Sequence, residues 1–300
     1  MRRIDPHVKV LDDRVVQRAV RAGLDAIVYA PHFTRLPEIQ RTARHYSSDD
    51  LLVVPGREVF TGAYGDRKHV LAIGLADPVP DFVELDAAMA EFERQDATVI
   101  APHPEFLTVG LDADDLWTYR DLIDAIEVYN PKYLPWHTRR AHDIVDELAL
   151  PAVGSSYAHL PWTVGDVWTE VDGAAAADGS GLAKFDGDGQ ADFDRHGRGD
   201  HDSSGQATHD ADGQRHGPRQ GSPEPPFGDE GDVAAALTSG PTRVRRRTGV
   251  GAASRASAEL LHLLWENSVE KVDRVVCSGL EATHPSHPAY GGRFDDSAVY

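Results

Sequence analysis

Short apolar runs alternate with amphipathic stretches between Ile4 and Val171, and this alternation is what most constrains the fold. The apolar runs occupy residues 24–29, 51–54, 70–75, 98–101, 125–128 and 151–153. Helical patterns lie between them, at 12–22, 35–46, 81–95, 112–122 and 136–148. Repetition of strand and helix predicts an α/β fold with a parallel sheet, here closed into a barrel. Gly23 is the expected C-cap of the first helix.

Histidines and one glutamate stand where these predicted strands end or begin. In a barrel of parallel strands the C-terminal strand ends converge on one mouth, so side chains distant in sequence meet there. Imidazole nitrogens and a carboxylate are ligands that suit zinc, manganese or iron. The sequence therefore predicts a metalloprotein that holds one or two divalent ions. The candidate ligands are His7, His32, Glu58, His69, His103 and His159.

The composition changes abruptly after the last of these strands. Few aliphatic residues occur from 173 to 232, where Asp, Gly, Gln, His, Ser and Pro dominate. Such a stretch buries too little apolar surface to offset its chain entropy, so we expect a disordered acidic insert. The predicted domains are the main part of the barrel at 1–172, the insert at 173–232, and a C-terminal helical continuation at 233–300 that ends in a surface tail.

Charge and hydropathy limit the partners of the chain. A formal net charge of −19 argues against general attraction to nucleic acid or to an anionic membrane. No apolar run is long enough to span a bilayer, and no secretory signal precedes the first strand, so we expect a cytoplasmic protein. The basic run 243–247 is expected to lie against an acidic surface. Many acidic residues with only five lysines make the composition similar to that of proteins from salt-loving archaea.

We therefore expect the folded protein to be more stable in molar KCl than in dilute buffer, because salt screens the repulsion between its acidic groups. Thermal unfolding followed by circular dichroism between about 0.1 M and about 3 M KCl measures this effect. A melting temperature that fails to rise with KCl contradicts the halophilic interpretation.

Five short motifs stand in a fixed order between the predicted strands. They are Asp5-Pro6-His7-Val8-Lys9, Ala30-Pro31-His32, Gly56-Arg57-Glu58 with His69 after it, Pro102-His103-Pro104, and Ser156-Tyr157-Ala158-His159. Together they resemble the PHP (polymerase and histidinol phosphatase) family of metal-dependent phosphoesterases. The resemblance covers about residues 3–171. It implies a distorted seven-stranded (βα) barrel, a TIM-like fold of the PHP type.

Three positions depart from the family motifs, which read Asp-x-His-x-His, Thr-Asp-His and Ser-Asp-Ala-His. Lys9 stands in place of a histidine, and Pro31 and Tyr157 stand in place of aspartates. The family holds up to three metal ions, and its glutamate bridges two of them. By resemblance, one ion keeps Glu58, His69 and His103, the adjacent ion keeps His7 and Glu58, and the third keeps His32 and His159.

The resemblance implies a metal-dependent hydrolase that acts on a small phosphorylated molecule through metal-activated water. Lys9 is expected to stabilise transition-state charge where a second ion normally sits, and Tyr157 to donate a hydrogen bond. Asp5 is placed with them in the catalytic group. Arg57 and Lys68 are expected to bind the phosphate.

The sequence also allows two alternative functions. The replaced ligands favour a PHP-fold protein that binds a metal or another ligand and has lost turnover. The same metal-activated water is also suited to an amide or another non-phosphate bond. A further expectation concerns Glu127, which ends a predicted strand and is placed to orient a ligand histidine.

Overall fold

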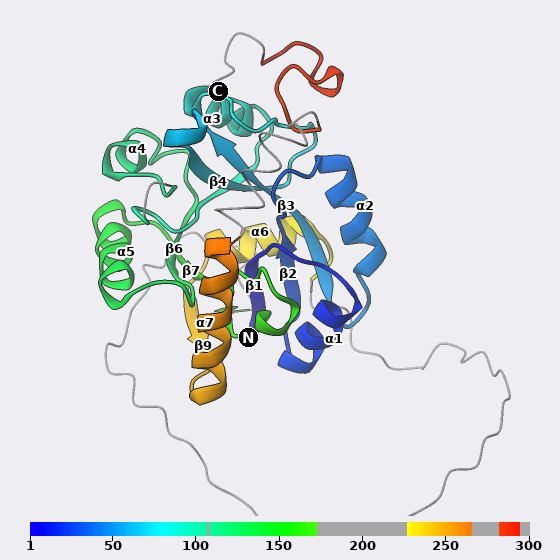
Figure 1. The fold of residues 1–300 in the computed structure, drawn as a ribbon, viewed down its shortest axis with the longest axis vertical. Helices are drawn as coiled ribbons and strands as arrows, with labels where there is room; N and C mark the ends of the chain where they lie inside the picture. Colours follow the sequence, from blue (N-terminus) through cyan, green and yellow to red (C-terminus); the bar gives the residue numbers. More distant parts are fainter. Residues whose placement is uncertain (107–108, 173–226, 266–281, 295–300) are drawn as a thin grey trace, which may run out of the picture. The chain divides into compact units, whose positions relative to one another are not determined.

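The computed structural model of this chain describes residues 1–106, 109–172, 227–265 and 282–294. Nine strands form one sheet, in the order β7-β6-β5-β4-β3-β2-β1-β8-β9 (Figure 1). The strands are β1 (Arg2–Val8), β2 (Ala26–Tyr29), β3 (Leu52–Thr61), β4 (Lys68–Ile73), β5 (Thr98–Ala101), β6 (Ala125–Tyr129), β7 (Ala152–Gly154), β8 (Val167–Val171) and β9 (Thr242–Arg246).

The two ends of this sheet nearly meet. The Thr242 hydroxyl on β9 donates a hydrogen bond to the Ala152 carbonyl on β7. The backbones of these strands come so close that a Cβ on Gly154 would lie 2.3 Å from the Val244 side chain. The fold is thus a mixed α/β, nearly closed nine-strand barrel, which confirms the predicted α/β barrel.

The helices expected from the sequence are present with small shifts at their ends. They are α1 (Asp13–Ala22), α2 (Leu36–Tyr46), α3 (Leu85–Arg94), α4 (Ala113–Thr118) and α5 (Pro135–Leu148), followed by α6 (Glu230–Thr238) and α7 (Val250–Trp265). Asp12 caps α1 by accepting a hydrogen bond from the Val15 amide at 2.9 Å. Gly23 ends it in the left-handed region, at φ 73°, as its position in the sequence predicted.

The sheet differs from the expected seven parallel strands in two respects, because it has nine strands and not all of them are parallel. Four neighbouring pairs are parallel, but β4 runs antiparallel to both β3 and β5, and β8 is antiparallel to both β1 and β9. Only residues 62–67 connect β3 to β4, and a parallel return requires a crossover of a dozen or more residues. Strand β4 therefore turns straight back, which brings its first residues beside the last residues of β3.

The C-terminal tail packs against the barrel instead of lying on its surface as expected. Tyr290 and Phe294 are buried in the core cluster that also holds Val59, Val70 and Phe92. The Thr283 carbonyl accepts a hydrogen bond from the Asp81 amide at 2.9 Å. Residues 282–294 are therefore part of the folded unit.

The predicted acidic insert lies mostly outside the described residues, which resume at Phe227. Phe227 is buried, Asp229 caps α6, and α6 begins at Glu230. The fold therefore uses residues that the sequence had assigned to the end of the insert.

We expect that deleting residues 178–224 leaves a cooperatively folding protein, because the sequence of that range offers few aliphatic side chains to a core. Urea unfolding of the deletion variant tests this, with intact protein alongside. A variant that also lacks residues 225–232 is the matched control, and we expect it to be less stable because it loses Phe227 and the α6 cap. Loss of the cooperative transition in the shorter deletion would contradict the prediction.

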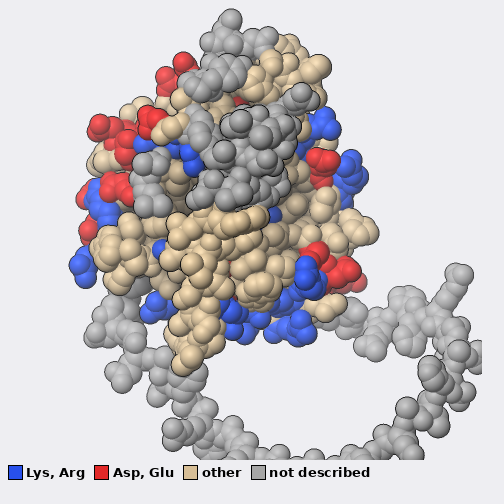
Figure 2. Space-filling model, in the orientation of Figure 1, with Lys and Arg blue, Asp and Glu red and all other residues tan. Residues whose placement is uncertain are grey.

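Basic side chains gather at one end of the face that carries α7, whereas most of the α7 surface is neither acidic nor basic (Figure 2). Within the basic run, Arg245 Nε lies 2.9 Å from Glu170 Oε2 on β8. Arg246 lies over the Tyr129 ring, 5.2 Å from its centroid. The ion pair with Glu170 agrees with the expected acidic neighbour. Among the helices that the structure describes, none is long and apolar enough to cross a membrane.

Candidate metal centre

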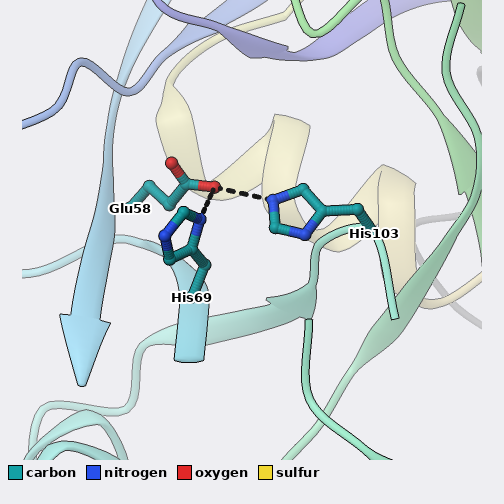
Figure 3. Close-up of side chains that lie close together, drawn as sticks. All are labelled: Glu58, His69 and His103. Atoms are coloured by element: carbon teal, nitrogen blue, oxygen red, sulfur yellow. Dashed lines mark hydrogen bonds and ion pairs between the residues drawn. The ribbon is translucent and has the colours of Figure 1, made fainter. Parts of the chain in front are cut away.

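The carboxylate of Glu58 is the centre of a buried cluster of histidines. Its Oε1 lies 3.3 Å from His7 Nε2, 3.4 Å from His69 Nδ1 and 3.2 Å from His103 Nε2. All four residues are at most 1% exposed. Figure 3 shows His69 and His103 pointing toward the same carboxylate oxygen of Glu58. Ligand atoms of Glu58, His69 and His103 lie within 4.8 Å of one another, a spacing at which one ion can bind all three.

Three of these side chains come from three different strands. His7 comes from β1, Glu58 from β3 and His69 from β4, where the antiparallel pairing sets His69 opposite Phe60. The His69 and Phe60 rings stack, with centroids 3.9 Å apart and an interplanar angle of 5°. This stacking fixes the plane of the His69 imidazole beside Glu58.

His103 reaches the cluster through a strained turn after β5. Its φ is 34°, a left-handed value that is uncommon for a residue other than glycine. The following loop folds back so closely that a Cβ on Gly110 would lie 2.3 Å from the His103 carbonyl oxygen. Gly110 therefore makes room for the turn that aims His103 at Glu58.

The second oxygen of Glu58 is occupied by a fixed cation. Lys9 Nζ donates to Glu58 Oε2 at 2.5 Å and to the Ala30 carbonyl at 2.7 Å, and His32 Nδ1 lies 2.9 Å from the same Oε2. Burial alone would raise the pKa of the Glu58 carboxyl. The Lys9 ammonium and the surrounding histidines outweigh that effect and hold its pKa well below the usual range.

Glu127, in the middle of β6, supports two of the histidines. Its Oε1 lies 3.4 Å from His7 Nδ1 and accepts a hydrogen bond from the Ser155 hydroxyl, while its Oε2 accepts from the His103 amide at 2.9 Å. Burial opposes its ionisation, but the contacts with His7 and His103 lower the pKa of Glu127 to about 2. This geometry agrees with the expected orienting role, because a carboxylate on one ring nitrogen leaves the other facing Glu58.

We expect Glu127→Gln to weaken metal binding by about 10- to 100-fold, the usual cost of losing a carboxylate that orients a ligand histidine. Titration of metal-free protein with Zn²⁺ against a competing chelator measures the change in dissociation constant. Glu93→Gln, on the exposed face of α3, is the matched control. Wild-type affinity in Glu127→Gln would contradict the orienting role.

Asp5 and Tyr157 shape the loop that closes the cluster. Asp5 accepts hydrogen bonds from the Ser156 amide at 2.9 Å and the Gly165 amide at 3.1 Å, and burial raises the pKa of its carboxyl to about 6. Tyr157 has a φ of 45°, and its ring centroid lies 4.6 Å from that of His7 and 5.2 Å from that of His103. Asp5 thus anchors the turn that holds the Tyr157 ring against two candidate ligands.

The two residues expected to bind phosphate lie elsewhere. Successive residues of a strand point to opposite faces, so Arg57 points away from the side of β3 that carries Glu58. Its Nη2 lies 2.6 Å from Asp81 Oδ2 and its Nη1 donates to the Glu58 carbonyl, all in the interior. Arg57 is therefore held away from the cluster in this structure, and its expected contact with phosphate stays a prediction. Lys68 Nζ pairs with Asp112 at 2.9 Å and Asp115 at 3.5 Å, which commits it to the start of α4.

The sequence patterns did not indicate two buried charged residues next to the cluster. Lys132 follows β6, and its Nζ lies 2.9 Å from His159 Nδ1. Glu259 extends from α7, and its Oε2 lies 3.7 Å from Lys132 Nζ. Lys132 shares one signal with the other candidates, since it lies just after a predicted strand. No sequence pattern marked Glu259 as a site residue, because it stands in the middle of a helix.

The donor set fits a divalent transition metal. Two imidazole nitrogens and one carboxylate oxygen are ligands that zinc, manganese and iron accept, and three protein ligands leave a position for water or substrate. Among the described residues, the buried His103 Nδ1 has no hydrogen-bond partner. His7 Nε2 faces the same Glu58 oxygen and is a fourth candidate ligand.

Comparisons with known proteins give distant likenesses. Residues 135–182 match the family model described as PHP-associated. PsfC from Pseudomonas syringae is 21% identical, with a TM-score of 0.47 over 59% of this chain and 85% of PsfC. A "putative metal-dependent phosphoesterase" from Bifidobacterium adolescentis is 14% identical, with a TM-score of 0.43 over 53% of this chain and 88% of that one.

An amidohydrolase from Chromobacterium violaceum is 12% identical, with a TM-score of 0.44 over 54% of this chain and 89% of that one. No curated protein matches the sequence. At these identities, what the protein does has to be inferred from its own side chains.

Proposed function

We propose that this protein is a metal-dependent hydrolase that cleaves phosphate esters. The observation that carries the proposal is the buried group of Glu58, His69 and His103, whose ligand atoms lie within 4.8 Å of one another. A divalent ion bound there would lower the pKa of a water molecule and polarise a phosphoryl oxygen. The order of the five motifs, which resembles that of metal-dependent phosphoesterases, supports phosphate esters as the substrate class.

The charges of the cluster support a single divalent ion. This region contains four buried carboxylates and two buried ammonium groups, an excess of two negative charges when all are ionised. An unbalanced buried charge is costly, and one divalent ion removes the excess. A second ion at Glu58 Oε2 would meet the Lys9 ammonium. The charged groups are Asp5, Glu58, Glu127, Glu259, Lys9 and Lys132.

The chain's own residues then have distinct tasks. Glu58, His69 and His103 hold the ion, with His7 beside them, and Glu127 orients His7 and the His103 turn. Lys9 keeps Glu58 ionised and supplies fixed positive charge at its second oxygen. The Tyr157 ring covers His7 and His103 and limits the access of bulk water to them.

Hydrolysis assays on metal-loaded and chelator-treated protein in high salt test this function. The panel contains phosphomonoesters, phosphodiesters and amides, each with zinc, manganese and iron. We expect phosphate release that depends on the metal and is lost in His103→Ala. Metal-dependent cleavage of amides alone would replace the proposal by amide hydrolysis. Stoichiometric metal binding with no turnover on any substrate would favour the binding protein instead.

A further inference from the structure

Lys132 is buried against the turn that carries Tyr157 and His159. Its Nζ donates to the Tyr157 carbonyl, lies 2.9 Å from His159 Nδ1, and lies 3.7 Å from the centroid of the Tyr157 ring. The Asn130 side chain, itself bonded to Glu127, accepts a hydrogen bond from the Lys132 amide at 3.0 Å. Lys132 thus joins the metal cluster to the loop after β7.

Glu259 compensates the charge of Lys132 from the opposite side. It is fully buried, and its carboxylate accepts hydrogen bonds from the His159 amide at 3.1 Å, the Leu160 amide at 2.9 Å and the Thr163 hydroxyl. Its other oxygen lies 3.7 Å from Lys132 Nζ. A carbonyl oxygen, a carboxylate and the face of an aromatic ring therefore surround Lys132 Nζ. These are the partners that an ammonium group takes, and we treat Lys132 as an ammonium on this geometry.

An ammonium group has donors and no acceptor, so His159 Nδ1 must be the acceptor in its contact with Lys132. The Tyr157 carbonyl, 3.0 Å from Nδ1, is a second acceptor for the same ammonium. A neutral imidazole whose Nδ1 accepts carries its proton on Nε2. Metal binding requires a ring nitrogen with a free lone pair. In this tautomer Nδ1 is occupied and Nε2 is protonated, so neither nitrogen is suited to a metal.

We infer that Lys132 is a positioning residue that makes His159 a hydrogen-bond donor to an anionic substrate oxygen, in contrast to the metal ligand that the motif implies. The His159 ring lies beside the metal centre, with its centroid 5.8 Å from that of His32, which contacts Glu58. A donor at this place suits a phosphoryl oxygen. This last step rests on the proposed function, whereas the tautomer does not.

Selective ¹⁵N labelling of histidine in the zinc-loaded protein reports the tautomer directly, and the signal missing in His159→Gln assigns the residue. We expect His159 to carry its proton on Nε2 in the wild type. In Lys132→Met the proton should move to Nδ1, where the Tyr157 carbonyl accepts it. The double variant Lys132→Met/Glu259→Gln removes both charges and tests the same change if the single variant does not fold. An Nδ1-protonated wild type would overturn the inference.

Metal and phosphate affinities test the role. We expect His159→Ala to keep one zinc ion with an affinity within about twofold of wild type, and to bind inorganic phosphate about 10- to 100-fold more weakly, the range for a hydrogen bond to a charged group. His159→Gln, which retains an N–H donor, should recover part of that affinity. Lys132→Arg should lie between wild type and Lys132→Met.

Loss of zinc in His159→Ala, as expected for His103→Ala, would show His159 to be a ligand and overturn the inference. Phosphate affinity unchanged in His159→Ala would overturn its role as a donor. If the zinc-loaded wild type binds no phosphate, the proposed phosphoesterase function fails together with the anion contact. The tautomer and the zinc affinity still decide in that case whether His159 is a donor or a ligand.

Discussion

His103→Ala and Glu58→Ala are expected to abolish tight metal binding, with a dissociation constant for zinc raised by more than about 100-fold. Each removes one of three ligand atoms that lie within 4.8 Å of one another, and the two that remain compete poorly with water. Titration against a chelator and metal analysis after dialysis measure affinity and occupancy. Added zinc should raise the melting temperature of the wild type and leave that of either variant unchanged.

His103→Ala is the cleaner of the two changes, because Glu58→Ala also removes the partner of a buried ammonium group. Breaking such a pair costs about 3–5 kcal/mol, so the metal-free Glu58→Ala protein should also be less stable. His45→Ala, exposed on α2, is the matched control and should bind zinc as the wild type does. Full zinc occupancy in His103→Ala would contradict the proposed metal centre.

The double change Lys9→His/Tyr157→Asp is expected to raise the number of bound metal ions from one to two. Lys9 Nζ lies 2.5 Å from Glu58 Oε2 and 5.7 Å from the centroid of the Tyr157 ring, and His32 Nδ1 lies 2.9 Å from the same oxygen. The ammonium repels a divalent ion there. Its replacement by an imidazole, together with a new carboxylate, adds two ligands beside Glu58 and His32.

Lys9→Ala alone removes the charge without supplying ligands. We expect it to bind no second ion, to destabilise the metal-free protein by about 3–5 kcal/mol, and to weaken phosphate binding or turnover. Lys68→Ala, which removes a lysine paired outside the cluster, should leave metal number and turnover unchanged. Metal analysis, urea unfolding and phosphate titration give the three readouts. The hypothesis that Lys9 takes the place of a second metal ion is contradicted by two results together. The double variant would bind only one ion, and Lys9→Ala would behave as the wild type does.

Much of the fold was predictable because its signals are local. The repeated apolar runs and helical periods set the order of the elements from Arg2 to Gly154, and a glycine that accepts a left-handed φ ended α1 at Gly23. The direction of each strand was harder to predict from the sequence. Nothing in the apolar run at 70–75 distinguishes a parallel strand from an antiparallel one, and the short β3–β4 connection decided it.

The residues of the candidate metal centre could also largely be picked out in the sequence. Residues at strand ends converge in a barrel, so the sequence predicted that His7, Glu58, His69 and His103 lie close together, as they do in the structure. The alternation of side chains along β3 also separates Arg57 from Glu58, and the opposite expectation for Arg57 came from its place in the motif. Its partner Asp81 lies 24 residues away and entered no local pattern.

Charge compensation was decided by the tertiary structure alone. A buried ammonium or carboxylate is stable only where its counter-charge lies within a few ångströms, and the chain meets that condition through contacts that no local pattern encodes. Glu259 reaches the His159 amide across 100 residues of sequence, and Lys9 reaches Glu58 across 49. The sequence determined which chemical groups meet at the mouth of the barrel. Only the tertiary structure determined which of them are free to bind a metal and which are held by an ammonium, because that depends on pairing over long separations.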